Sequence, residues 1–349
     1  MRFGTVTDVQ PGICTVKVAG GEIPVIYLKG GAPTKGEFVA VHRQGVVSYL
    51  FNPPTLGALW VGDSGLFGIW RVPTSGQDPV FYPIYGEPIT GVVEGPDKAI
   101  WACSSSTVSY VWRMESSGPQ IGNVSEVQLP SAAPTGICVG PDGNLWVSDS
   151  NGYVWKVTTG LVATPYALPG SAPYAIASGS DGNLWVVDEG GAIQSVWRVT
   201  PQGATTQFLL DSNASPSGLA LGSDGNIWVA DQSGRVWRVT PNGTRTPFPV
   251  GNTPVEICSG PSGDLWVLDA INAVLQVNTS GSVVNSFPLP GGTGAEGTWY
   301  AITQGPDGNL WIAQALAAGG SAVKMTPAGV VTPYTLTSTG APTSICSGP

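Results

Sequence analysis

Along residues 54–349, short apolar stretches alternate with turns rich in glycine, aspartate and proline. The clearest unit surrounds Trp228, where apolar or alternating stretches at 217–222, 227–231, 235–240 and 245–250 are separated by the turns "SDGN", "QSG" and "PNG". Asp-Gly and Asn-Gly dipeptides suit the positive φ angles of tight hairpins. A turn about every 8 to 12 residues favours strands over helices, so the pattern predicts a four-stranded antiparallel unit.

This unit recurs along the chain. Its motif tryptophan, as in "GNIWVAD", occurs at intervals of 38 to 45 residues, at Trp60, Trp101, Trp146, Trp185, Trp228, Trp266 and Trp311. A period of about 40 to 45 residues is the length of a four-stranded propeller blade. The sequence therefore predicts an all-β domain, a seven-bladed β-propeller over residues 54–349.

The two ends of this domain predict how the ring closes. The first repeat begins at "PTLGALW" and lacks an innermost strand, whereas the final stretch "GAPTSICSGP" (340–349) matches the innermost-strand sequence "AAPTGICVGP" (132–141) almost residue for residue. We expect the final stretch to complete the first blade. Such closure removes the open strand edge that would otherwise pair with other chains.

The hairpin register can be counted from the turns. Pairing Asp231 with Arg235 across "QSG" places Trp228 opposite Arg238. The same count places a cation opposite the tryptophan in six of the seven repeats, at Arg71, Arg113, Lys156, Arg198, Arg238 and Lys324, with Gln276 in the seventh. We expect these cations to stack on the indoles as structural pairs, each contributing about 0.5–1 kcal/mol.

Residues 1–53 have a different pattern. Five short alternating stretches, at 2–9, 13–20, 22–29, 37–44 and 46–52, are separated by proline or glycine turns and lack the tryptophan motif. Five strands in about 50 residues favour a small N-terminal barrel of the OB type, with an SH3-like barrel as the alternative. The aromatic residues of this segment lie on apolar strands and are interpreted as core.

Charge and composition narrow the range of partners. Residues 1–53 carry five basic and three acidic side chains, and residues 54–349 carry nine basic and twenty acidic ones. An acidic propeller and a weakly basic barrel argue against nucleic acid as a partner. The start "MRFGTVTDVQ" has no signal-peptide pattern and no stretch of 18 apolar residues occurs, so neither export by a signal peptide nor a membrane span is expected.

The five cysteines form no Cys-x-x-Cys motif. Cys138, Cys258 and Cys346 occupy equivalent positions in "ICVG", "ICSG" and "ICSG". Side chains at equivalent positions of separate repeats point alike and not at one another. These cysteines are therefore interpreted as small buried hydrophobic residues and not as disulfide partners.

The repeat P-x-G-I-x-x-G-P-D-G-x-L-W resembles the virginiamycin B lyase family of seven-bladed propellers. Lyases of that family use a histidine in a "P-H-G-I" setting at the channel mouth, together with acidic residues and a magnesium ion. In this chain the histidine position is held by Thr90, Thr135, Tyr174, Ser217, Val255, Tyr300 and Thr343, and the one histidine, His42, lies outside the propeller. The resemblance therefore implies the fold without the lyase mechanism, so no catalytic residue and no cofactor is expected.

An aspartate follows the motif tryptophan in five repeats, at Asp63, Asp149, Asp188, Asp231 and Asp269, with Ser104 and Gln314 in the other two. A ring of carboxylates facing the channel could hold a cation. Each aspartate also stands directly before a turn, where its side chain can accept hydrogen bonds from backbone amides. The turn interpretation is preferred, and no metal site is predicted.

The segment "PTKGEFVAVHRQG" (33–45) resembles the N-terminal barrel of minor tail proteins from phages of actinobacteria. This resemblance implies a non-enzymatic virion protein of the tail tip or baseplate, made in the host cytoplasm. The barrel would dock to other tail proteins, and the propeller would face outward in a homo-oligomer for host attachment. His42, within this segment, is interpreted as a solvent-facing structural residue. The alternatives are a propeller lyase or hydrolase, for which the rim offers Glu256, and a free lectin-like carbohydrate-binding protein.

The candidate ligand site of the propeller is the channel rim. Its hydroxyls and rings suit a sugar, which presents apolar C–H faces and many hydroxyls. The candidate residues are Thr90, Thr135, Tyr174, Ser217, Tyr300 and Thr343, although these side chains could instead only cap the innermost strands. Longer connections form a second candidate surface, at residues 63–68, 189–195, 289–300 and 314–321.

Overall fold

The computed structural model describes the backbone of the strands within residues 2–51, and residues 57–348 except 85–87, 131, 191–193, 252, 272, 290–297, 317–318 and 338–339. The chain divides into two compact units, Met1–Thr55 and Leu56–Pro349. No helix of the described residues is long and apolar enough to cross a membrane.

The first unit contains five strands in one antiparallel sheet. The strands are β1 (Arg2–Gln10), β2 (Ile13–Val18), β3 (Gly21–Ile26), β4 (Phe38–Val41) and β5 (Val47–Phe51), in the order β3-β2-β1-β4-β5. The expectation of an OB-type barrel, and the role of His42, depend on connections and side chains outside the described residues.

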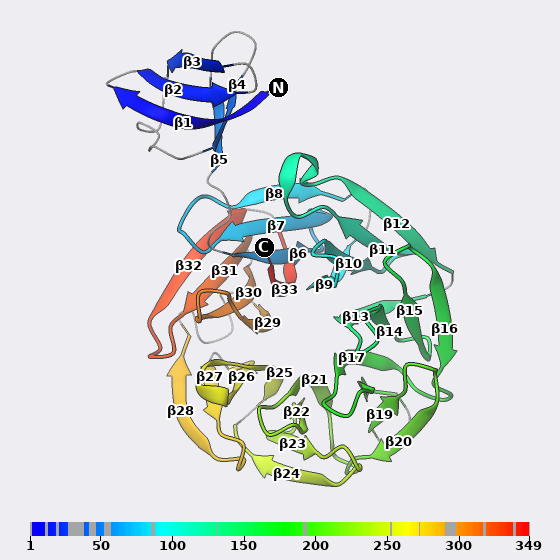
Figure 1. Ribbon diagram of the computed structural model, residues 1–349. Coiled ribbons are helices and arrows are strands. Elements are labelled where there is room, and N and C mark those ends of the chain that lie inside the picture. The colour runs from blue at the N-terminus through cyan, green and yellow to red at the C-terminus, as the bar shows by residue number, and fades with distance from the viewer. Residues whose placement is uncertain are drawn as a thin grey trace. The chain divides into compact units, whose positions relative to one another are not determined.

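The second unit is a seven-bladed β-propeller (Figure 1). Each blade is a four-stranded antiparallel sheet, as the turn spacing predicts. From the innermost strand outward, the blades are as follows: blade 1, β33 (Pro342–Gly348), β6 (Ala58–Asp63), β7 (Gly68–Pro73) and β8 (Val80–Pro83); blade 2, β9 (Ile89–Glu94), β10 (Ile100–Ser104), β11 (Ser109–Met114) and β12 (Val124–Leu129); blade 3, β13 (Pro134–Val139), β14 (Leu145–Asp149), β15 (Tyr153–Val157) and β16 (Ala163–Ala167).

The other blades have the same order. Blade 4 consists of β17 (Pro173–Ser178), β18 (Leu184–Asp188), β19 (Ser195–Val199) and β20 (Thr205–Leu209); blade 5 of β21 (Pro216–Leu221), β22 (Ile227–Asp231), β23 (Arg235–Val239) and β24 (Arg245–Pro249); blade 6 of β25 (Pro254–Ser259), β26 (Leu265–Asp269), β27 (Ala273–Val277) and β28 (Val283–Pro288); blade 7 of β29 (Thr298–Gln304), β30 (Leu310–Leu316), β31 (Gly319–Met325) and β32 (Val331–Thr337). The described helices are two short 3₁₀ turns, at Gly118–Gln120 and Pro261–Gly263.

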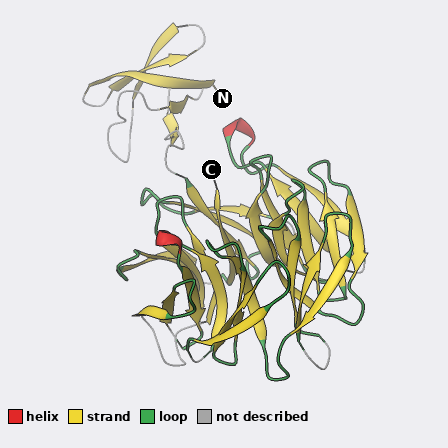
Figure 2. Ribbon diagram, turned by 60° about the horizontal axis from the view of Figure 1, so that its bottom comes forward, coloured by secondary structure: helices red, strands yellow, loops and turns green. Residues whose placement is uncertain are grey.

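The ring closes as the sequence predicts. Strand β33 pairs antiparallel with β6, with Cys346 opposite Trp60 and Ile345 opposite Val61. Blade 1 therefore takes three strands from the beginning of the propeller and one from its end, and Figure 1 shows the C-terminus beside β6. The loops between strands lie at the two faces of the propeller (Figure 2).

The core lies between neighbouring blades and is organised around the motif tryptophans. All seven are at most 1% exposed. In five blades the indole N–H donates to the aspartate of the preceding turn, as in Trp146 to Asp142 at 3.0 Å. In six blades an aromatic ring of the outermost strand packs on the indole, with 5.5 Å between the ring centroids of Trp146 and Tyr166. The tryptophan thus joins the turn, the second strand and the outermost strand of its blade.

The hairpin register counted from the turns is confirmed, and the predicted stacking of cations on the motif tryptophans is confirmed in part. Every motif tryptophan lies opposite the expected residue of the third strand. Cation stacking on the tryptophan occurs in four blades, at Arg71, Lys156, Arg238 and Lys324, with 5.7 to 6.0 Å from the cationic group to the ring centroid. Arg198 lies over Phe208 instead, and Arg113 forms ion pairs with Asp97 and Glu115. An ion pair does not by itself prevent stacking, because Lys156 and Lys324 stack on the indole and also pair with Asp142 and Asp307.

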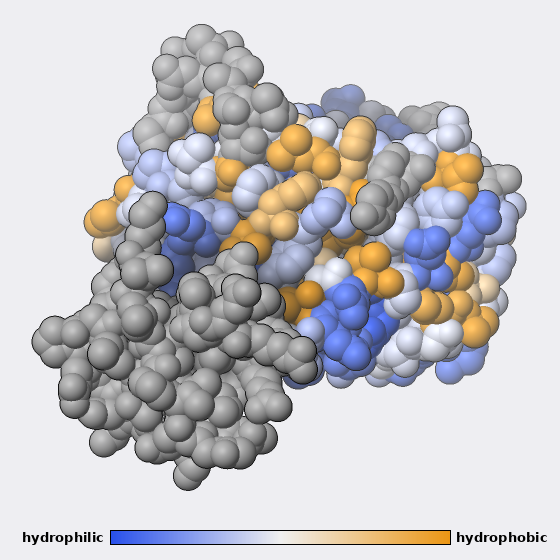
Figure 3. Space-filling view, turned by 90° about the horizontal axis from the view of Figure 1, so that it is seen from above, coloured by the Kyte–Doolittle hydropathy of each residue, from blue (hydrophilic) through white to orange (hydrophobic). Residues whose placement is uncertain are grey.

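The outer wall of the propeller is mixed in polarity. Val80 and Val124, on the outermost strands β8 and β12, are exposed. Figure 3 shows apolar residues of this wall interspersed with hydrophilic ones.

Cys103, Cys138, Cys258 and Cys346 are free thiols, in agreement with their interpretation as small hydrophobic residues.

Candidate functional site

The seven predicted rim positions share one backbone feature. In each blade the register between the innermost strand and the second strand shifts beside the rim residue, so that an extra residue stands on the innermost strand. In blade 3, Pro134 pairs with Asp149 and Gly136 with Ser148, which leaves Thr135 as the extra residue. Such a β-bulge changes the direction of a side chain. The structure therefore brings Thr90, Thr135, Tyr174, Ser217, Val255, Tyr300 and Thr343 to equivalent bulges at one end of the innermost strands.

The short hydroxyls at these bulges bind the backbone of the next blade. Thr135 Oγ1 lies 3.0 Å from the carbonyl oxygen of Pro173, Ser217 Oγ lies 3.3 Å from that of Pro254, and Thr343 Oγ1 donates to that of Ile89 at 2.7 Å. Each of these acceptors directly precedes the next bulge. Thr90 Oγ1 donates within its own blade, to the carbonyl oxygen of Cys103.

These contacts narrow the candidate ligand site. A hydroxyl has a single proton to donate, and the four short ones already have backbone acceptors. Tyr174 and Tyr300 differ from them, because their side chains are 45% and 43% exposed. Of the seven rim residues, the two tyrosines therefore present the largest exposed fraction to a ligand.

The position after the bulge holds a small residue in six blades, namely Gly91, Gly136, Ala175, Gly218, Ala301 and Ser344. The reason is steric, because neighbouring innermost strands approach closely: a Cβ added at Gly136 would lie 3.2 Å from the carbonyl oxygen of Tyr174. Blade 6 has Glu256 at this position. Its carboxylate occupies space that the neighbouring blade leaves open, since a Cβ on Gly218 would collide with Glu256 Oε1.

Glu256 is partly exposed along the channel wall but surrounded by protein. This burial raises the pKa of its carboxyl to about 8, although the Ile257 amide donates to Oε1 at 3.0 Å. Among the described residues no lysine or arginine forms an ion pair with Glu256. A buried carboxyl without a counter-charge favours its neutral form.

Three further groups belong to the same electrostatic neighbourhood. Burial raises the pKa of the Tyr174 phenol, and the negative charges of Glu256, Glu189 and Tyr300 raise it further. Burial and then Asp188 raise the pKa of Glu189. Tyr174, Glu256 and Tyr300 stand at or directly after the bulges of β17, β25 and β29, so all three lie at the same end of the innermost strands, in blades 4, 6 and 7.

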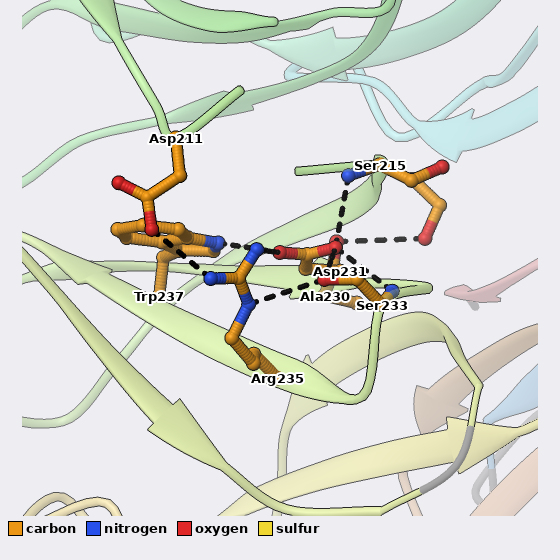
Figure 4. Close-up of polar contacts among 8 residues, drawn as sticks. Asp211, Ser215, Ala230, Asp231, Ser233, Arg235 and Trp237 are labelled. Carbon is orange, nitrogen blue, oxygen red and sulfur yellow. Dashed lines mark hydrogen bonds and ion pairs between the residues drawn. The ribbon is translucent and has the colours of Figure 1, made fainter. Parts of the chain in front are cut away.

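The recurring aspartates are turn residues, as preferred from the sequence. Asp231, at 0% exposed, accepts hydrogen bonds from the amides of Ser215 and Ser233 and from Trp237 Nε1 (Figure 4). Asp63, Asp149 and Asp188 have the same three kinds of donor, and Asp269 accepts from the amides of Thr253 and Ile271. These carboxylates join the turn to the incoming loop. Within the described residues no three His, Cys, Asp or Glu side chains are placed to hold a metal ion.

The longer connections expected to carry function lie at the same end of the blades as the bulges. Residues 63–68, 189–195 and 314–321 join second and third strands, and 289–300 leads into β29. Within them, residues 191–193, 290–297 and 317–318 lie outside the described residues. A cavity of about 470 Å³ lies at the carboxyl ends of the innermost strands and is lined by Glu94, Lys98, Thr303 and Cys346 among others. It is separate from the rim.

The protein belongs to the class of closed seven-bladed β-propellers. Its rim carries hydroxyls, two tyrosines and one buried carboxyl. The model of the virginiamycin B lyase family matches residues 36–293 and 169–349, and the chain belongs to this family. No curated protein sequence is similar enough to match the chain.

Solved structures agree on the fold. Selenomethionine-substituted virginiamycin B lyase from Staphylococcus aureus is 24% identical, with a TM-score of 0.63 over 71% of this chain and 84% of that one. A catalytically inactive variant of that lyase with quinupristin is 23% identical, with a TM-score of 0.64 over 79% and 88%. A protein from Lactobacillus plantarum is 13% identical, with a TM-score of 0.66 over 84% and 99%. At these identities the likeness concerns the fold.

Proposed function

We propose that this protein is a non-enzymatic structural component of a phage virion, a minor tail protein of the tail tip or baseplate. In this proposal residues 1–53 form an OB-like barrel that docks to other tail proteins. The propeller faces outward as an interaction module, with a host-surface glycan as its ligand. The protein is made in the host cytoplasm and assembles as a homo-oligomer in the virion.

One observation carries the binding role: none of the seven bulge residues at the rim is a histidine, while two of them are exposed tyrosines. The family lyases act through an imidazole at this position, and without it general base catalysis of that kind has no group to perform it. Exposed phenol rings instead suit the C–H faces of a sugar ring. The resemblance of residues 33–45 to tail proteins supports the docking role of the first unit.

The virion assignment is tested by mass spectrometry of purified particles. We expect peptides of both units, at a stoichiometry typical of a tail component. Particles without this chain would contradict the assignment and leave a free lectin-like protein as the explanation of any sugar binding.

Glycan binding is tested on an array of bacterial surface glycans with the full-length protein. Tyr174→Ala and Tyr300→Ala should each weaken binding about tenfold, since a stacked aromatic ring contributes on the order of 1 kcal/mol or more. Tyr153→Ala is the matched control, because this tyrosine is 40% exposed but lies on the third strand of its blade. Equal binding by all three variants would exclude the rim.

A second function, a lyase or hydrolase, is favoured by Glu256 alone, whose raised pKa suits a general acid or base. Quinupristin, found with the inactive Staphylococcus aureus lyase, is a suitable probe. Our proposal expects both the chromatographic retention and the mass of quinupristin to stay unchanged after incubation with this protein, since hydrolysis would add the mass of water and a ring-opening elimination would change the retention alone. Conversion that is lost in Glu256→Gln would establish an enzyme instead.

A further inference from the structure

Glu256 is the exception to the small-residue rule of the channel wall. Six blades hold glycine, alanine or serine after the bulge, where a Cβ or a longer side chain meets the neighbouring strand. At blade 6 a carboxyl extends toward Gly218, and the absence of a Cβ at Gly218 leaves the space for it. The local fold thus provides a place for one acid at the channel wall.

The groups around this acid define what could bind there. Tyr174 and Tyr300 are half-exposed at the bulges of blades 4 and 7, and Tyr174 interacts electrostatically with Glu256, Glu189 and Tyr300. The set offers two aromatic faces and carboxylates, and no basic group of the described residues forms an ion pair with Glu256. The set offers no positive charge to an anionic ligand, and the described residues include no three groups that could chelate a metal.

A protonated primary amine can interact favourably with each of these groups. Its charge pairs with a carboxylate, and its positive end is attracted to the electron-rich faces of tyrosine rings. We propose that Glu256, Tyr174 and Tyr300 form a subsite for an ammonium group. Since this inference rests on the proposed binding of a host-surface glycan at the rim, the ligand class is a sugar that carries a free amino group.

Binding at this subsite is coupled to a proton. In the free protein the Glu256 carboxyl holds its proton at neutral pH, because burial raises its pKa. An ammonium group stabilises the carboxylate, so the carboxyl releases one proton to solvent as the ion pair forms. The titratable groups that interact with Glu256 are the Tyr174 phenol and, on its own strand, the Cys258 thiol, and the pKa values of both are raised. The Tyr300 phenol stands at the bulge of the next blade, on β29, and Gly218 on β21 brings no titratable group. None of these raised pKa values places a second titration at neutral pH.

Calorimetry with the full-length protein at pH 6.5 tests the subsite. The probes are a tetramer of glucosamine, the matching tetramer of N-acetylglucosamine and n-butylamine. We expect the amino tetramer to bind at least tenfold more tightly than the acetylated one. Its measured heat should change with the ionisation enthalpy of the buffer, which reports the released proton. n-Butylamine should bind weakly with the same proton release.

Glu256→Gln should abolish both the preference for the amino tetramer over the acetylated one and the proton release. Glu126→Gln, on the outermost strand β12, is the matched control and should behave as the natural protein does. Equal affinities for the two tetramers in the natural protein would overturn the amine subsite and leave glycan binding intact. Binding of n-butylamine that depends on Glu256, without binding of either sugar, would support the subsite and contradict the glycan proposal.

Discussion

Replacement of Asp231 by alanine should destabilise the propeller more than its size suggests. The carboxylate is fully buried and accepts hydrogen bonds from Trp237 Nε1 at 2.7 Å and from the Ser215 and Ser233 amides at 2.9 Å each. Its Oδ2 also forms an ion pair with Arg235 at 3.1 Å. Figure 4 shows Arg235 between this carboxylate and Asp211.

The magnitude follows from what the substitution leaves behind. Ser215 and Ser233 are exposed, so water can replace their lost acceptor, but Trp237 is only 3% exposed. An unsatisfied buried donor costs about 1–3 kcal/mol, and the loss of one partner of a buried ion pair costs about 3–5 kcal/mol. Because Arg235 keeps Asp211, we expect about 3–4 kcal/mol for Asp231→Ala. At about 2–4 °C per kcal/mol, the melting temperature should fall by about 10 °C.

The assay is urea unfolding followed by tryptophan fluorescence, with Asp211→Ala as the control. Asp211 pairs with the same arginine but is 59% exposed, so its loss should cost less than about 1 kcal/mol. Burial alone would raise the pKa of Asp231, but hydrogen bonds from Ser233, Ser215 and Trp237 lower it overall. Its stabilisation is therefore present above about pH 4 and is lost as pH falls further. Equal stability of the two variants at pH 7 would refute this reasoning.

Three further predictions concern other parts of the propeller. Gly243→Ala should lower the free energy of unfolding in urea by about 1–3 kcal/mol more than Gly143→Ala does, because both glycines have positive φ but only a Cβ at 243 collides with the Phe208 ring. Similar losses in the two variants would contradict this contact. Removal of residues 340–349 should yield aggregated protein in size-exclusion chromatography, rescued by a peptide of that sequence, whereas a soluble monomer would show that blade 1 needs no β33. Glu256→Gln should gain stability relative to the natural protein as pH rises from about 5 to about 9. The reason is that the Glu256 carboxyl has a pKa of about 8 in the folded protein, above its value in the unfolded chain, so the natural protein loses stability as pH rises between these two pKa values. Parallel profiles of stability against pH for the two proteins would exclude a buried acid.

The repeat made most of the architecture predictable. A turn of known length fixes the hairpin register, so counting from Asp231 to Arg235 placed Trp228 opposite Arg238. Closure by residues 340–349 was visible because one strand was missing at the start and present at the end. Each of these inferences uses contacts within a blade, which the local sequence determines.

Contacts between blades were not predictable in the same way. The acceptors of Thr135, Ser217 and Thr343 belong to the next blade, and they arise from a bulge that adds one residue without any turn signal in the sequence. Glu256 was recognisable as an acid near the rim. The bulges of the structure show that Glu256 stands at the position directly after the bulge, which holds glycine, alanine or serine in the other six blades.

The shared construction of blade 1 has a consequence for biosynthesis. The partner of β6 is β33, so a ribosome translates more than 270 intervening residues before the strand that completes the sheet emerges. Until then, the inner edge of β6 has no strand to pair with, and this open edge is exposed to aggregation and to binding by chaperones. The order of synthesis makes the first blade to appear the last to be finished.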